Sequence, residues 1–520
     1  MTPRWMLVLF SALLAGVTGA AAGDKTDVVR DLAGRVGPII GSALACRDIA
    51  RPRIQIIVDK FTAVITEAST TEAERSDLTQ VLDRNVANGR GTVTSGRIDC
   101  GMADRQLADL ERSIARPTAP TLPAVISPSL SAAAATAPTA AVPTGSAVRG
   151  ITDREIRFGI AAPFSGASKE LGRQMKLGIE IAFNRVNDAG GVEGRMLKLI
   201  AADDAFTPAR TAEAMKQLYD KDQVFGVIGN VGTSTAAVAV PYALERRMLF
   251  FGGFTGANVI RNDPPDRYVF NYRASYTEET DAAVRYFVKM RRILPRQIAV
   301  FAPQQDPGGD AGYAGVAKAF RTLGFSDAGI LRLEYKRNTV DVDDAVNLLK
   351  AQKVPIKAVV MIASYRAAAR FIEKTRDLYP DMLYSNVSFV GSTALAEELK
   401  LLGPRYSTGA IVTQVVPAVS GYSSIVLEYK NALTKYFPGE APDYVSLEGY
   451  VSANVLIQAL KRAGPQLDTE RLIDVLENMR NLDLGLGAQL SFGRAEHQAS
   501  HKIWGTALDE TGKYQAIELE

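Results

Sequence analysis

The chain has 520 residues, more than the roughly 250–300 at which a single hydrophobic core stops growing, so we expect several domains. Hydrophobic residues make up 47% of the chain and charged residues 22%, as is typical of globular proteins. A net charge of +3 gives no electrostatic reason to expect nucleic acid or a membrane surface as a partner, and both are set aside.

Residues 1–22 are predicted to be a secretory signal peptide. Arg4 gives a basic start, and Leu7–Val17 is an apolar run shorter than the about 20 residues of a membrane-spanning helix. Ala20–Ala22 then supply the small side chains of a cleavage site. The alternative is a buried N-terminal helix. A signal peptide predicts a periplasmic or secreted protein.

Residues 23–115 are predicted to form a small helical module, because apolar residues recur at helical spacing in stretches such as Ile54–Ile65. The module holds the only cysteines, Cys46 and Cys100. In an oxidising compartment such a pair is predicted to form a disulfide, and two free thiols are the alternative. We assign this module no chemistry and expect a packing or docking appendage.

Residues 116–149 are predicted to be a linker. The stretch Pro117–Pro143 consists almost wholly of Ala, Pro, Thr, Ser and Val, which cannot bury enough surface to offset its conformational entropy. Its repeated prolines favour extended conformations, so we expect a semi-rigid spacer.

Short β-branched runs alternate with amphipathic stretches from residue 150 onward. The expected strands are Ile156–Ala161, Arg195–Ala201, Val224–Ile228, Met248–Phe251, Gln297–Phe301, Leu331–Tyr335 and Ala358–Ile362, and the expected helices are Lys169–Asp188, Pro208–Asp220, Thr233–Arg246, Gly312–Leu323, Val342–Gln352 and Tyr365–Asp377. This alternation predicts an α/β fold with parallel sheets covered by helices on both faces. About 370 residues exceed one such sheet, so two lobes are expected.

No catalytic residue, metal site or cofactor is predicted. The sequence lacks the Gly-x-Ser-x-Gly, P-loop and His-Glu-x-x-His motifs. His497 and His501 are four residues apart, but Gly493, Ser500 and the apolar run after them indicate a turn and a strand rather than a metal-binding helix. Asp203-Asp204 is interpreted as a polar strand end. We therefore do not expect an enzyme.

Several segments in order resemble the branched-chain amino-acid-binding proteins, which have the type I periplasmic binding fold. They are Ile156–Ile160 with Pro163–Gly166, Asn184–Gly191, Gly226–Gly229 with Gly232–Thr235, Gln297–Phe301, Ala358–Met361 and Phe389–Gly391. The resemblance covers roughly residues 150–520. It implies two Rossmann-like lobes, the first of about 150–272 and 418–488 and the second of about 273–417 and 489–520. Three crossings are expected near Asn271–Tyr276, Ile411–Pro417 and Gln489–Phe492.

The resemblance also implies a ligand pocket between the lobes. The loop Thr233-Ser234-Thr235, at a helix N-terminus, would hold a ligand carboxylate through hydroxyls and backbone N–H groups; the alternative is that Thr233 only caps the helix. Phe254-Thr255 would form a second ligand loop, or a simple turn. The segment Asp306–Tyr313 would form another rim loop, or a plain solvent turn.

Two further side chains are assigned by the resemblance. Leu171 would lie over the ligand, although ordinary packing would also explain it. Tyr365 would cover apolar ligand surface from the opposite lobe.

Two positions depart from the family pattern. Relatives hold the ligand ammonium with acidic side chains where this chain has Tyr276 and Thr393, although a shift of two residues in the comparison would bring in Glu278. Burying an ammonium without a carboxylate is costly, so a small carboxylate, an amide or an aromatic acid would suit Tyr276, Tyr365, Thr233 and Thr393 at least as well as an α-amino acid.

The function that follows is a solute receptor of an ABC transporter that delivers a small amino acid or related carboxylate to a membrane permease. The alternative is a sensory receptor of the same fold that reports to a membrane signalling protein, which the extra helical module and linker would suit.

Overall fold

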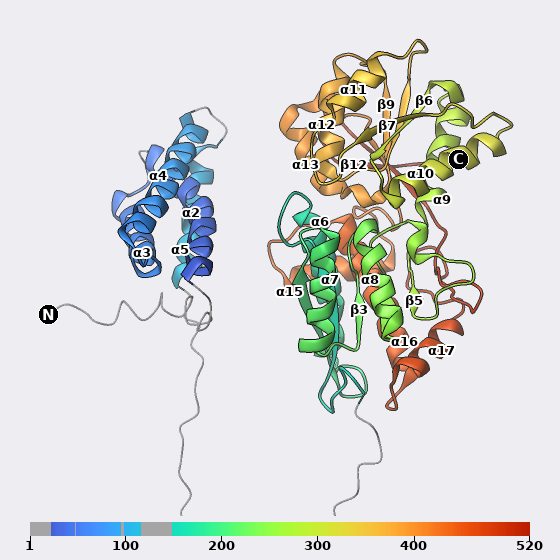
Figure 1. Ribbon diagram of the computed structural model, residues 1–520, viewed down its shortest axis with the longest axis horizontal. Coiled ribbons are helices and arrows are strands. Elements are labelled where there is room, and N and C mark those ends of the chain that lie inside the picture. The colour runs from blue at the N-terminus through green and yellow to red at the C-terminus, as the bar shows by residue number, and fades with distance from the viewer. Residues whose placement is uncertain (1–21, 47, 95–97, 116–147, 520) are drawn as a thin grey trace, which may run out of the picture. The chain divides into compact units, whose positions relative to one another are not determined.

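The computed structural model describes residues 22–46, 48–94, 98–115 and 148–519. The chain divides into two compact units, Met1–Ala140 and Ala141–Glu520 (Figure 1). The predicted signal peptide lies outside the described residues except for Ala22, and the predicted linker lies outside them except for residues 148 and 149. None of the helices in the described ranges is both long and apolar enough to cross a membrane.

The N-terminal unit is helical. Its helices are α2 (Ala22–Ala45), α3 (Arg51–Ala68), α4 (Glu72–Thr94) and α5 (Cys100–Ala115). Side chains from all of them, among them Ile40, Ile57, Leu78 and Leu107, are buried in one core. A disulfide joins Cys46, just after α2, to Cys100 at the start of α5. The bond ties the end of α2 to the start of α5.

The first lobe of the larger unit is built on a parallel five-stranded sheet in the order β2-β1-β3-β4-β5. The strands are β1 (Glu155–Ala162), β2 (Met196–Asp203), β3 (Gly226–Ile228), β4 (Leu249–Phe251) and β5 (Val269–Phe270), and the helices are α6 (Lys169–Asp188), α7 (Pro208–Lys216), α8 (Thr233–Glu245), α15 (Ser424–Tyr436), α16 (Tyr444–Ala463) and α17 (Thr469–Glu477).

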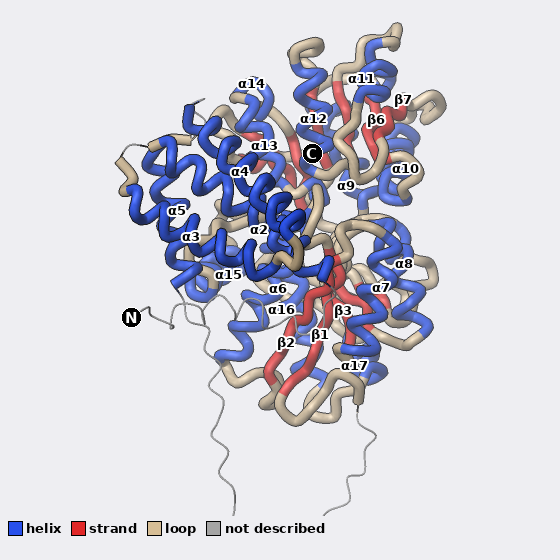
Figure 2. The backbone as a smooth tube through the Cα atoms, turned by 60° about the vertical axis from the view of Figure 1, so that its left-hand side comes forward, coloured by secondary structure: helices blue, strands red, loops and turns tan. Residues whose placement is uncertain are grey.

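Helices cover both faces of this sheet because successive strand residues point to opposite sides. Phe158 and Ile160 of β1 are buried in the core that includes α6 and α16, whereas Ala161 is buried with side chains of α7 and α8. Figure 2 shows α6 and α16 on one side of strands β1–β3 and α7 and α8 on the other. Strands β3, β4 and β5, and β1 from Phe158 onward, are buried on both faces and are the apolar runs expected of a parallel sheet, whereas the edge strand β2 exposes Met196, Lys198 and Ala201.

The second lobe has a seven-stranded sheet in the order β12-β11-β10-β9-β8-β6-β7, parallel from β7 to β10 and antiparallel at the β11–β12 edge. The strands are β6 (Ile298–Pro303), β7 (Leu331–Tyr335), β8 (Ala358–Met361), β9 (Leu383–Asn386), β10 (Ile411–Gln414), β11 (Trp504–Leu508) and β12 (Tyr514–Ile517), and the helices are α9 (Tyr276–Arg285), α10 (Pro307–Thr322), α11 (Asp343–Lys350), α12 (Tyr365–Arg376), α13 (Ser392–Leu402) and α14 (Pro404–Ser407). The predicted fold, two α/β lobes preceded by a helical module, is confirmed.

The chain passes between the lobes three times, but one passage differs from the expectation. The first follows β5 and ends at α9, and the second follows β10. The third was expected at Gln489–Phe492. However, the Phe492 ring lies 5.4 Å from that of Phe270 and His497 stacks on Phe270 at 3.8 Å, so both belong to the first lobe. The third passage therefore lies between Gln498, which pairs with Asn271 of the first passage, and β11.

Candidate functional site

A small cavity lies where the carboxyl ends of the strands of both lobes meet. It has a volume of about 30 Å³ and is lined by Phe206, Thr233, Tyr276, Pro303, Asp306, Gly308, Tyr335, Arg337, Asn338, Ile362, Ala363, Ser364 and Phe389. Phe206 and Thr233 follow β2 and β3 of the first lobe, Tyr276 ends the first passage, and the others belong to the second lobe. The edge of the sheets that carries the cavity is the one at which α/β folds bind ligands.

Thr233 begins helix α8, and the preceding Gly232 makes that start possible. Gly232 has a φ of 107°, and a Cβ there would lie 2.3 Å from the Phe206 ring, so a side chain would be both strained and crowded. The Thr233 hydroxyl does not cap the helix but bonds that of Thr255 at 2.7 Å. The first N–H groups of α8 have no intrahelical partners, so this end of the cavity suits an anion.

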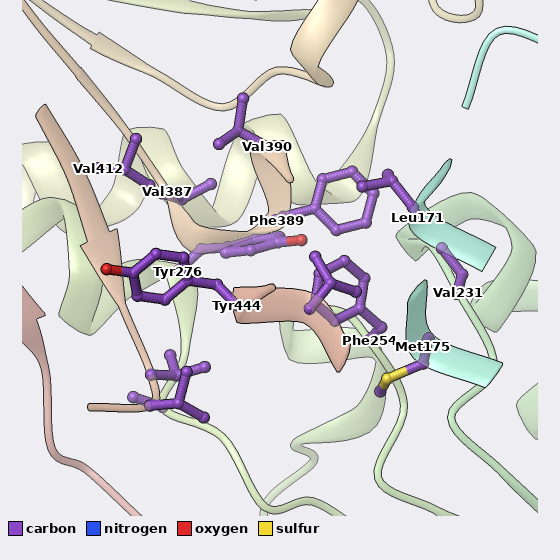
Figure 3. Packing of buried hydrophobic residues seen from close by; sticks show 14 of the residues in the cluster. Leu171, Met175, Val231, Phe254, Tyr276, Val387, Phe389, Val390, Val412 and Tyr444 are labelled. Carbon is purple, nitrogen blue, oxygen red and sulfur yellow. The ribbon is translucent and has the colours of Figure 1, made fainter. Parts of the chain in front are cut away.

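Aromatic rings fill the centre of the cleft. The ring of Phe389 lies 6.0 Å from that of Phe206, 5.3 Å from that of Phe254 and 6.2 Å from that of Tyr276. Figure 3 shows Phe389 near Leu171, Phe254 and Tyr276. Burial raises the pKa of Tyr276 to about 12, so its phenol remains neutral and can donate a hydrogen bond. The rings provide an apolar wall beside the hydroxyl of Thr233.

Asp306 supplies a carboxylate to the cavity from the second lobe. It is 7% exposed, caps α10 by accepting from the Gly308 N–H at 2.8 Å, and has a pKa that burial raises. A Cβ built on Gly308 would lie 2.8 Å from both Asp306 Oδ1 and Thr233 Oγ1. An acidic and a hydroxyl oxygen therefore face the same small volume from opposite lobes.

The residues predicted for the pocket occupy different places. Thr233 and Tyr276 line the cavity, while Phe254 and Thr255 are buried behind them. The Thr235 hydroxyl donates to the Val231 carbonyl at 2.5 Å, and Ser234 Oγ is buried without a hydrogen-bond partner among the described residues. The hydroxyls of Ser234, Thr235 and Thr255 are therefore not among the groups that line the cavity in the described part of the chain.

The other predicted side chains mark contacts between the lobes. Leu171 packs so closely on Gly391 that a Cβ there would lie 2.6 Å from it, and Gly391 has a φ of 78°. Tyr365 donates its hydroxyl proton to the Ala167 carbonyl at 2.7 Å. Thr393 lies beside the carboxyl of Asp443, whose pKa burial raises.

Glu278, the alternative acid, points to the hinge rather than the cavity. Its carboxylate accepts from Ser275, Gln498 and His501, the last at 2.6 Å. Burial opposes the ionised form, but the bonds from His501 and Ser275 prevail and hold the pKa of Glu278 at about 2. His501 also contacts Glu496, at 3.1 Å. Glu278 is thus a structural link between α9 and the third passage.

A second charged cluster is buried where the passages meet. Arg273, 1% exposed, lies 2.9 Å from Glu279 of the second lobe and 3.5 Å from Glu448 of the first. The other Glu279 oxygen accepts from the Ser388 N–H at 2.7 Å and from the Thr413 hydroxyl at 2.6 Å. Burial raises the pKa of Glu448 to about 7 despite Arg273. Glu279 is the nearer of the two carboxylates and the one that accepts a hydrogen bond from Arg273.

Comparison with known proteins places this arrangement in a family. Residues 155–513 match the family model described as periplasmic binding protein. The chain belongs to this family. Among solved structures, a possible leucine/isoleucine/valine-binding protein from Rhodopirellula baltica SH 1 is 35% identical, with a TM-score of 0.66 over 72% of this chain and 98% of that one.

More distant relatives of this periplasmic binding protein agree on the fold. Leu/Ile/Val-binding protein homolog 3 of Brucella melitensis is 24% identical over 339 residues, which are 64% of this chain and 86% of the relative. A solute-binding protein from R. palustris, solved with benzoate, is 17% identical, with a TM-score of 0.60 over 70% of this chain and 95% of that one. The chain is thus a type I periplasmic binding protein of the leucine/isoleucine/valine-binding type.

Sequence reasoning missed several cavity residues of this binding protein. Phe206, Arg337 and Asn338 were not selected, although Phe206 follows β2 and the other two follow β7. Because ligands of parallel sheets lie beyond the carboxyl ends of strands, their positions offered a signal. Within the described residues no group of three or more His, Cys, Asp or Glu side chains is arranged to hold a metal ion.

Proposed function

We propose that residues 148–520 form an extracytoplasmic solute receptor that closes its lobes on a small ligand and presents the closed form to the permease of an ABC transporter. The observation that carries the proposal is the cavity between the lobes, with Thr233 and the N-terminus of α8 at one side. The lobes would close by rotating about the three passages. A ligand that binds the closed form more tightly than the open form would increase the population of the closed form.

The ligand we propose is a small amino acid or a related carboxylate. Its carboxylate would accept from Thr233 and the N–H groups of α8, where the helix dipole favours negative charge. The carboxylate of Asp306 faces the same volume and would pair with the ammonium group of an amino-acid ligand, which the uncharged side chains of Tyr276 and Thr393 cannot do. A volume of about 30 Å³ is close to that of one water molecule, so a solute needs the lobes to separate, or the rings of Phe206 and Phe389 to move, before it can enter.

Family membership supports a binding protein rather than an enzyme, located in the periplasm after removal of a signal peptide. The separate, disulfide-bonded helical unit favours a second candidate, a sensor that reports to a membrane signalling protein. Deleting the gene separates the two. Loss of uptake of the identified solute supports transport, and intact uptake with loss of the transcriptional or motile response supports sensing.

A thermal-shift screen of residues 148–520 tests the proposal. Amino acids, aliphatic acids and aromatic acids are compared at equal concentration, and a ligand at 100 times its Kd should add about 2.7 kcal/mol to the free energy of unfolding. We expect a shift from at least one small carboxylate-bearing solute. A screen in which no such solute shifts the melting temperature contradicts the proposal.

Thr233→Val removes the anchoring hydroxyl and keeps the shape of the side chain. A hydrogen bond to a charged group contributes about 1.5–3 kcal/mol, so the Kd of the identified carboxylate should rise about 10- to 100-fold, measured by isothermal titration calorimetry. Thr235→Val is the matched control, since its hydroxyl binds only the Val231 carbonyl in the described residues and should leave the Kd nearly unchanged. Parental affinity in Thr233→Val would exclude Thr233 as an anchor.

A further inference from the structure

Three side chains of the second lobe donate hydrogen bonds to backbone carbonyls of the first. Tyr365 Oη donates to the Ala167 carbonyl at 2.7 Å. Arg337 Nη1 and Asn338 Nδ2 both donate to the Phe206 carbonyl, each at 2.9 Å. The donors follow β8 and β7, and the acceptors follow β1 and β2. These bonds join the two sheets across the cleft and can form only when the lobes are closed.

The acceptor loops are fixed in advance by Asp203. Its Oδ1 accepts from the N–H groups of Phe164 at 2.8 Å and Ala205 at 3.0 Å, and its Oδ2 accepts from the Ser165 hydroxyl at 2.6 Å. One carboxylate therefore ties together the two loops that carry the acceptor carbonyls.

The neighbouring Asp204 fixes the backbone at Phe206. Its Oδ1 accepts from the Phe206 N–H at 2.9 Å and its Oδ2 from the Thr211 hydroxyl at 2.9 Å. These bonds support an unusual backbone, since Ala205 and Phe206 have φ values of 46° and 61°. The Phe206 carbonyl is thus presented to Arg337 and Asn338 without rearrangement of its own loop, which lowers the entropy lost on closure.

Tyr365 takes part in the hydrogen bonds between the lobes but does not line the cavity. Its side chain is 3% exposed, and it is absent from the residues that line the 30 Å³ cavity in the described part of the chain. Its hydroxyl donates to a backbone carbonyl of the first lobe, which every solute would leave unchanged. A group that acts only on closure changes the fraction of protein competent to bind, and this fraction multiplies the affinity for all ligands alike.

We propose that Tyr365, Arg337 and Asn338 form a closure clasp on the carbonyls of Ala167 and Phe206, and that Tyr365 is a positioning residue that strengthens binding of every solute by the same factor. The clasp rests on the proposed solute-binding function. It assigns to Tyr365 a role in setting the closed population rather than in choosing the ligand.

Tyr365→Phe in the full chain tests the clasp. Loss of one neutral hydrogen bond should raise the Kd about 3- to 10-fold for each of several solutes found by the screen, with the ratios between solutes unchanged. Tyr268→Phe is the matched control, since Tyr268 donates to Glu470 at 2.6 Å within the first lobe and its loss should leave each Kd as in the parent. Unchanged Kd values in Tyr365→Phe, or altered ratios between solutes, would overturn the clasp.

Hydrogen–deuterium exchange gives a second readout, on the closed form itself. With a saturating solute from the screen bound to the full chain, a Tyr365→Phe, Asn338→Ala variant should exchange faster in the loops 163–169 and 204–208 than the parent, because their closing contacts are lost. Equal exchange in both loops would overturn the clasp. Failure of the solute screen alone would instead count against the proposed function.

Discussion

Glu279→Gln is expected to destabilise the bilobal unit by about 3–5 kcal/mol, because it leaves the buried Arg273 without its ionised partner. Glu279 is fully buried and uses both carboxylate oxygens, one toward Arg273 and the other toward Ser388 and Thr413. Glu448 cannot replace it, since its pKa of about 7 leaves it partly protonated at neutral pH and its oxygen is 3.5 Å from Arg273. Urea unfolding of residues 148–520, followed by the fluorescence of Trp504, measures the change.

Glu440→Gln is the matched control for this prediction. Glu440 pairs with Arg173 at 2.9 Å, but both side chains are more than a third exposed, and such surface pairs contribute about 0–1 kcal/mol. We expect Glu440→Gln to unfold at nearly the parental urea concentration. If Glu279→Gln did the same, the cluster around Arg273 would not be a major source of stability.

Replacing Cys46 and Cys100 by serine is expected to lower the stability of the helical unit by about 4 kcal/mol. The disulfide joins residues 54 positions apart. Closing a loop of that length lowers the conformational entropy of the unfolded chain, which stabilises the folded unit by about 4 kcal/mol. The effect should be confined to the helical unit, because residues 148–520 contain no cysteine. Far-UV circular dichroism of each unit during urea unfolding measures both the loss of stability in the helical unit and the unchanged stability of residues 148–520.

The parent chain under reducing conditions provides an independent comparison for the cysteine variant. Dithiothreitol should shift the helical unit to the same midpoint as the variant and leave the bilobal unit unaffected. A helical unit whose midpoint changes by less than the equivalent of about 1 kcal/mol in both cases would show that its packing suffices without the bond.

Much of the fold could be predicted because local sequence pattern and tertiary burial agree. The helix expected at Lys169–Asp188 has these bounds in the structure, since the spacing of its apolar residues indicates a helix and the glycines after it indicate the same end. The helix expected at Gly312–Leu323 begins earlier, at Pro307, because Asp306 caps it and offsets the poor helix propensity of Gly308 and Gly309. Long periodic elements were thus predictable, whereas a start fixed by one side-chain bond was not.

The third passage and the contacts across the cleft could not be predicted from sequence. Phe492 belongs to the first lobe because its ring packs on that of Phe270. The two residues are 222 positions apart, so no local sequence pattern predicts this contact. Likewise, Tyr365 was expected to cover the ligand but bonds the Ala167 carbonyl. Both outcomes depend on how two separately folded sheets meet. Thr233, by contrast, could be placed, because its position follows from a single strand–turn–helix unit.

The central claim is that the two lobes close on a small solute. Because Cys46 and Cys100 pair with each other, cysteines introduced at the exposed Lys216 in α7 and Lys318 in α10 would be the only free thiols of the full chain. Spin labels at Lys216→Cys and Lys318→Cys, read by double electron–electron resonance, report the separation of the lobes. A saturating solute from the screen should narrow the distance distribution and shift it to shorter values. The same distribution with and without a solute that demonstrably binds would contradict closure.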